Sequence, residues 1–163
     1  MQAIVAFVLS ILVCSFLEYW IHRIMHLWPW FGGTLTDHYL HHQRNNASGM
    51  LREFKNYSIL VPVVSAPFFF VSQAMGLSML AGTTAYAIFA AYAHQLQHEN
   101  PITCFWQPMP VHYVHHRYNQ WHHNYGIALD WWDRIFGTYQ FTEWRADDRL
   151  PQPEQAPWQL KFW

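Results

Sequence analysis

The chain has 163 residues, enough for one domain with its own core, and its formal net charge of −1 argues against nucleic-acid binding through counterion release. Only 12% of the residues are charged and 19% are aromatic, a composition that suits a chain with much of its surface in lipid. Cys14 and Cys104 are too few for a disulfide framework or a thiolate metal site.

The first predicted element is a membrane helix over residues 3–21, in which Glu18 is the only Asp, Glu, Lys, Arg or His. A helix of this length extends about 28 Å, which matches the apolar thickness of a bilayer. A secretory signal peptide is the competing interpretation, but no basic segment and no small-residue cleavage site precede the first histidines. We therefore expect the helix to be retained.

Residues 22–55 are polar and form the first part of a predicted metal-binding cap. Aromatic side chains on either side of Pro29 predict a belt at the membrane interface. Two glycines follow and break the helix, and Thr36 or Asp37 is in position to cap the next helix.

Two further spans are predicted within residues 56–93, which contain no Asp, Glu, Lys, Arg or His. We place them at about 57–75 and 77–93, with a turn near residues 73–78 and a kink from the prolines of the first span. All basic residues lie in the two polar regions, 22–55 and 94–163. The positive-inside rule then predicts three spans, an external N-terminus and every histidine on the cytoplasmic side.

The second part of the cap covers residues 94–140. Asn124, Tyr125 and Gly126 predict a turn, and a short amphipathic helix is expected over 130–139, ending at Gly137. The proline-containing tail, residues 141–163, is expected to be extended.

Histidines dominate both parts of the cap. Two pairs have i, i+4 spacing and two trios have HxxHH spacing, which places their members on one helix face, so that three imidazoles of a trio can converge on one point. The ten candidate metal ligands are His22, His26, His38, His41, His42, His94, His98, His112, His115 and His116.

A single HxxxH pair is usually accidental, but four clusters on one side of a membrane favour metal binding. Ten imidazoles exceed the needs of one ion and fit two ions with about five nitrogens each. Imidazole binds iron, zinc, copper and nickel, so the ligand type does not select the metal. The sequence contains no HExxH motif, so it does not indicate a zinc protease. Haem needs only one or two axial ligands, which are normally placed within membrane spans.

Four other residues are candidates for supporting roles. Glu18 lies one turn before His22, where it could orient that ring; the alternative is a glutamate reaching the lipid headgroups. His122 and His123 are either supporting residues behind the ligands or interfacial side chains, and Asn124 joins them as a candidate.

The ordered motifs HRIMH (22–26), HYLHH (38–42), HQLQH (94–98), HYVHH (112–116), NYG (124–126) and WWDRIFGTY (131–139) resemble the fatty acid hydroxylase superfamily. This superfamily includes sterol desaturases, sterol methyl oxidases, fatty acid 2-hydroxylases and carotene hydroxylases. The resemblance runs from about Glu18 to Tyr139. The chain departs from the family in its short length, in three rather than four predicted spans, and in lacking a fused cytochrome b5 domain.

The resemblance implies an all-α integral membrane domain with two iron ions, held by the ten histidines, and O2 as co-substrate. Zinc could occupy the same nitrogens. The implied reaction hydroxylates or desaturates a C–H bond of a sterol, fatty acyl or related lipid, with electrons from a separate carrier of the ferredoxin or cytochrome b5 type. The implied membrane is a bacterial inner membrane or the endoplasmic reticulum.

Three classes of function remain open from the sequence. The leading one is a lipid oxidoreductase of the sterol desaturase or acyl hydroxylase kind, with a carotenoid hydroxylase as a less favoured variant. The second is a membrane protein that binds metal without catalysis. The third is a haem electron-transfer protein.

Overall fold

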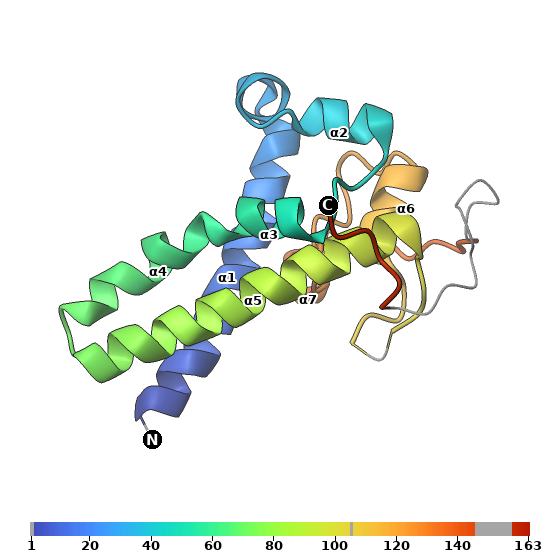
Figure 1. Ribbon diagram of the computed structural model, residues 1–163. Coiled ribbons are helices and arrows are strands. Elements are labelled where there is room, and N and C mark those ends of the chain that lie inside the picture. Colours follow the sequence, from blue (N-terminus) through green and yellow to red (C-terminus); the bar gives the residue numbers. More distant parts are fainter. Residues whose placement is uncertain (1, 105, 146–157) are drawn as a thin grey trace.

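The computed structural model describes residues 2–104, 106–145 and 158–163, and this described part is helical, with no β-strand (Figure 1). The elements, in chain order, are α1 (Gln2–Leu27), the π-helix η1 (Phe31–Leu35), α2 (His38–Arg44), α3 (Met50–Ser58), α4 (Leu60–Phe69), α5 (Gln73–Glu99), α6 (Val111–Arg117) and α7 (Trp131–Phe136). The expectation of an all-α membrane domain is confirmed.

Helices α1 and α5 form the centre of the molecule and cross each other (Figure 1). Small residues allow close approach at the crossing: a side chain at Gly82 of α5 would lie 1.9 Å from the Ser10 hydroxyl of α1. Among the described residues, these two helices are long and apolar enough to cross a bilayer. The C-terminal turns of both helices carry histidine pairs.

The region predicted as a span at 57–75 is divided between two helices. Helix α3 ends at Ser58, and α4 is a separate ten-residue helix, whose length of about 15 Å is half of a bilayer core. Pro62 has no N–H to donate to the Ser58 carbonyl, which accounts for the break at this point.

Helices α4 and α5 form an antiparallel pair (Figure 1). The turn between them lies at residues 70–72, slightly before the predicted position, and the Ser72 hydroxyl caps α5 by accepting from Met75 N–H at 3.2 Å.

The polar ends of α1 and α5 lie near α2 and α6 (Figure 1). Helix α7 packs against the middle of α1, where the Trp132 indole donates to the Ser15 hydroxyl at 3.0 Å. Helix α7 confirms the short helix predicted over 130–139, and Gly137 ends it in the left-handed conformation, at φ 69°. Asp37 precedes α2, but it makes no capping hydrogen bond with its side chain. The Thr36 hydroxyl instead donates to the Phe31 carbonyl at 3.0 Å, within the π-turn.

The described end of the chain packs against α3. The carbonyls of Lys161 and Phe162 accept hydrogen bonds from Met50 and Leu51 N–H, at 2.8 and 2.9 Å, and so satisfy free donors of the first turn of α3. Residues 146–157 of the predicted extended tail lie outside the described residues.

Candidate dimetal centre

All ten candidate histidines gather in one buried or half-buried cluster with two subsets of ring nitrogens. In each subset one nitrogen per residue lies within 4.8 Å of the others. The first nitrogen group consists of His22, His26, His38 and His42, together with His115, which contacts two of its members. The second nitrogen group consists of His41, His98, His112 and His116, together with His94, which contacts one.

Each HxxHH trio is shared between the two groups, so the expectation that three imidazoles of a trio converge on one point is wrong. In α2, His38 and His42 belong to the first group and His41 to the second. In α6 the i and i+4 rings belong to the second group, and His115 reaches the first. Residues i and i+4 are almost aligned along a helix, whereas i+3 points about 100° away from i+4. A trio therefore divides its rings between the two nitrogen groups.

The environment of His26 shows why a cation fits the first group. Its Nε2 atom lies 2.8 to 3.2 Å from the Nε2 atoms of four other imidazoles, those of His22, His38, His42 and His115. A neutral ring has one N–H and one lone pair, so a single Nε2 cannot hydrogen-bond to all of them. Lone pairs that converge in this way are stable when they share a cation.

The second group shows the same convergence. The Nε2 atoms of His94 and His41 are 3.2 Å apart, and those of His98 and His112 are 3.1 Å apart. Within the described residues, both ring nitrogens of buried His116 lack a hydrogen-bond partner. Since buried polar groups are normally satisfied, these nitrogens also fit metal ligation.

The His116 ring connects the groups by stacking on His42, with 3.9 Å between ring centroids and 13° between ring planes.

Backbone carbonyls orient two rings of the first group. His22 Nδ1 lies 2.6 Å from the Tyr125 carbonyl, and His115 Nδ1 lies 2.7 Å from the His123 carbonyl. A carbonyl only accepts, so both rings carry their proton on Nδ1 and present the Nε2 lone pair to the cluster.

A carboxylate, rather than a backbone carbonyl, faces a ring of the second group. Glu53 of α3 is buried, and its Oε2 lies 2.9 Å from His94 Nδ1, while its Oε1 accepts from Ser48 N–H at 3.0 Å. Burial raises the pKa of Glu53, but His94 and the hydrogen bonds outweigh it and lower that pKa to about 2. The sequence prediction missed Glu53, although it is the only Asp or Glu between residues 38 and 98.

Burial keeps the imidazoles of α2 and α6 in the form that binds metal. It is the main cause that lowers the pKa of His41, His42 and His115 to about 3, and neighbouring imidazoles contribute. The pKa values of His38, His112 and His116 are lowered in the same direction. These rings are therefore neutral near pH 7, and an unprotonated ring nitrogen has a lone pair that can bind a metal ion.

Glu18 does not make the predicted contact with His22, and it does not reach the lipid headgroups. Its buried carboxylate accepts from the N–H groups of Ile127 and Ala128 at 3.0 and 3.1 Å, and from the Tyr86 hydroxyl at 3.1 Å. The Tyr125 carbonyl orients His22 instead. The role predicted for the glutamate, orienting the His22 ring, is therefore filled by the backbone of a distant loop. Spacing within one helix cannot reveal such a contact.

The same loop is held from the other side by Asp133 of α7. Its two carboxylate oxygens accept from Tyr125 N–H at 2.8 Å and from Gly126 N–H at 2.6 Å. A side chain at Gly126 would lie 2.2 Å from the Leu129 carbonyl, so the close approach requires glycine. The NYG and WWDRIFGTY motifs therefore form one unit, which fixes the carbonyl that orients His22.

The three remaining candidates lie in the chain around this loop. Asn124 is buried at φ 59°, and its amide bonds to Gln120 and to the backbone of Gln140, not to a histidine ring. His122 and His123 are exposed, and His123 supports the centre through its backbone carbonyl.

Comparison with known protein families decides the assignment. The model of the fatty acid hydroxylase family matches residues 7–138, which include all ten histidines. The chain belongs to the fatty acid hydroxylase family. Searches of curated proteins and of solved structures found no match. Family membership implies a membrane oxidoreductase that acts on lipid C–H bonds, and the two nitrogen groups fit metal binding.

Proposed function

We propose that this protein is a di-iron, O2-dependent oxidoreductase that hydroxylates or desaturates a C–H bond of a lipid, either a sterol, a fatty acyl chain or a related molecule. The observation that carries the proposal is the convergence of imidazole nitrogens from α1, α2, α5 and α6 into two adjoining groups. Such a pair of groups fits two metal ions better than one haem.

The ten histidines would hold the two ions, five in each nitrogen group. Iron bound there would supply the O2 chemistry that an unactivated C–H bond requires; zinc would fit the same nitrogens without supplying it. The chain itself orients the ligands, through Tyr125, His123 and Glu53, and buries the centre away from bulk water.

The apolar helices suit a substrate that arrives from the bilayer. Many large apolar side chains of α1, α4 and α5 are exposed, as expected of a surface in contact with lipid. We place the N-terminus outside and the centre at the cytoplasmic end of the spans, in a bacterial inner membrane or the endoplasmic reticulum, because every basic residue lies on the histidine side.

The direct test is turnover by purified protein in lipid nanodiscs. Loaded with iron and supplied with reductant, it should convert a lipid into a product heavier by one oxygen or lighter by two hydrogens, and only when O2 is present. Mass spectrometry of lipids from cells with and without the gene would select the substrate. The same preparation loaded with zinc should be inactive.

Two other outcomes separate the alternatives. Two bound metal ions with no O2-dependent product would support a metal-binding protein without catalysis. A Soret absorption band in the purified protein would identify haem and overturn the proposal. Conversion of a carotenoid in preference to sterols and acyl chains would retain the reaction and change the substrate.

A further inference from the structure

A small pocket lies between α1, α5 and the junction of α3 with α4 (Figure 1). It adjoins the close contact between α1 and α5 at Gly82. The surface of the pocket is almost entirely apolar, and its free volume is about 10 Å³, close to the smallest space that holds one water molecule. Seven residues line it: Cys14, Glu18, Tyr57, Leu60, Thr83, Tyr86 and Ala87.

The pocket opens at the break between α3 and α4. Tyr57 and Leu60, on either side of the break, are half-buried, whereas the lining residues of α1 and α5 are buried. The side chains of Ile59 and Val63 next to the break are 66% and 63% exposed. The pocket is therefore closed toward the centre of the helix bundle and accessible from the apolar exterior, where lipid lies.

The same pocket reaches one of the candidate ligands. The Tyr57 ring meets the His94 ring edge to face, with 6.2 Å between ring centroids. Along α5, Ala87 precedes His94 by two helical turns, or about 10 Å. A single aromatic side chain therefore contacts both the apolar pocket and the second nitrogen group.

The polar groups of the lining are largely engaged elsewhere. The Glu18 carboxylate accepts from the Tyr86 hydroxyl and from two backbone N–H groups, and the Thr83 hydroxyl donates to a carbonyl of its own helix at 3.0 Å. The Tyr57 hydroxyl and the Cys14 thiol could offer a water molecule at most two further partners, one of them weak. Buried waters make about three hydrogen bonds, so this pocket favours an apolar occupant.

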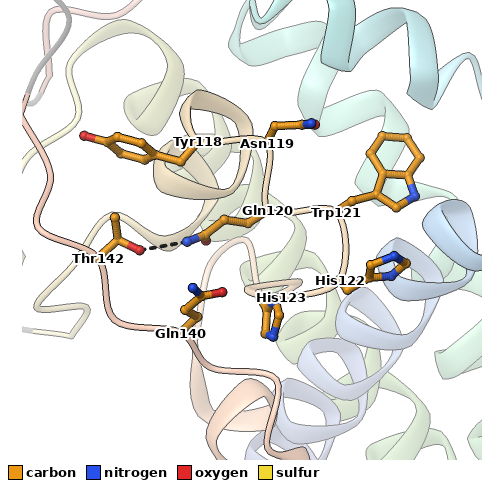
Figure 2. Close-up of a pocket in the computed structure, with 8 residues that line it drawn as sticks. All are labelled: Tyr118, Asn119, Gln120, Trp121, His122, His123, Gln140 and Thr142. Carbon is orange, nitrogen blue, oxygen red and sulfur yellow. Dashed lines mark hydrogen bonds between the residues drawn. The ribbon is translucent and has the colours of Figure 1, made fainter.

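The hollow in the loop after α6 is of a different kind (Figure 2). It is open and much larger, at about 410 Å³, and amide, hydroxyl and imidazole groups are part of its lining. Figure 2 shows one of these amides, that of Gln120, donating to the Thr142 hydroxyl at 2.7 Å. Water finds hydrogen-bond partners in this hollow that the small pocket lacks.

We infer that the small pocket is the site through which O2 enters the protein from the bilayer and at which it is held beside the second nitrogen group. The inference rests on the proposed function, in which O2 is the co-substrate. O2 is diatomic and apolar and dissolves better in hydrocarbon than in water, so it matches the pocket in size, lining and position. A sterol or an acyl chain does not, because pockets for such ligands measure about 300–1,000 Å³.

Occupancy is tested without turnover in the zinc-loaded protein, which is diamagnetic and consumes no O2. The protein is labelled at its alanine methyl groups and placed in lipid nanodiscs under O2 pressure. Dissolved O2 is paramagnetic and accelerates the NMR relaxation of nearby nuclei. The Ala87 methyl should show a larger increase in relaxation rate than those of Ala90 and Ala91, which are fully buried in the same helix but do not line the pocket.

Access is tested by filling the pocket. Ala87→Val adds two methyl groups and should lower kcat/KM for O2 by about three- to tenfold in the iron-loaded protein, with the lipid KM unchanged. The matched control Ala85→Val, at an exposed position of the same helix, should behave like the parent. Leu60→Ala enlarges the pocket and should increase the effect of O2 on the Ala87 methyl, which tests the site even if the valine variant fails to fold.

Two results would overturn the inference while the proposed function stands: equal effects of O2 on the three alanine methyls, or an unchanged kcat/KM for O2 in Ala87→Val. A raised lipid KM in that variant with an unchanged O2 dependence would also overturn it, by assigning the pocket to the lipid. Absence of O2-dependent product in the parent protein would instead contradict the proposed function, while the relaxation rates would still report whether O2 occupies the pocket.

Discussion

The two histidine-bearing halves of the chain, α1 with α2 and α5 with α6, build their nitrogen groups in the same way. Each half supplies an i, i+4 pair from a long helix and an i, i+4 pair from the following trio. Each trio then sends its i+3 ring into the other half's group, as His41 and His115 do. Neither group is complete without the other half, so the two ion sites should form together.

The halves differ in what lies behind the ligands. Backbone carbonyls, which are neutral, accept from His22 and His115 in the first group. A carboxylate faces His94 in the second group. An anionic partner makes an imidazole a stronger donor to a metal. We therefore expect the second group to hold its ion more tightly, and the variants below can test that difference.

The largest effect is expected from loss of a shared ligand. His41→Ala or His115→Ala should abolish product formation and lower metal content, because each removes a ring that one half contributes to the other half's group. Elemental analysis of the purified protein measures the loss. Full activity in either variant would refute the ligand assignment.

Next in size is the loss of the carboxylate behind His94. Glu53→Gln should weaken binding of one ion by about 10- to 100-fold and leave the other nearly unchanged. Metal titration with a competing chelator resolves the two ions. Lys55→Gln, an exposed change on the same helix, is the control. Equal weakening of both ions would remove the proposed difference between the groups.

A smaller effect is expected from the loop that orients His22. Asp133→Asn leaves Tyr125 or Gly126 N–H facing an amide nitrogen, which should cost about 1–3 kcal/mol of stability. Thermal unfolding measures this loss, and metal titration should show the first group weakened more than the second. Asp130→Asn, which removes an ion pair with half-exposed Arg134, should cost less.

Acidification should lower the stability of the metal-free protein through the histidines of both nitrogen groups. In the folded protein the pKa values of His41, His42 and His115 are about 3, below the ordinary value of 6.5. Between these values the unfolded chain binds more protons, so the stability of the metal-free protein should fall as pH decreases below about 6.5. Unfolding measured from pH 7.5 to 5 tests the slope; a melting temperature that rises on acidification would contradict it.

The smallest effect is expected at His123. Its ring is exposed and only its backbone carbonyl supports His115, so His123→Ala should retain nearly full metal content and activity. A loss comparable to that of His115→Ala would make the His123 ring itself a ligand.

The sequence by itself determined the helical membrane class, the family and the ten histidines, because apolar length and repeated i, i+3, i+4 spacing are local properties that one helix expresses. It also placed α7 and its terminal Gly137. The sharing of each trio between two nitrogen groups, the Glu53 contact and the partners of Glu18 were decided only by the tertiary structure. These depend on contacts between residues far apart in the chain, and no spacing within one helix records which neighbour its side chains will meet.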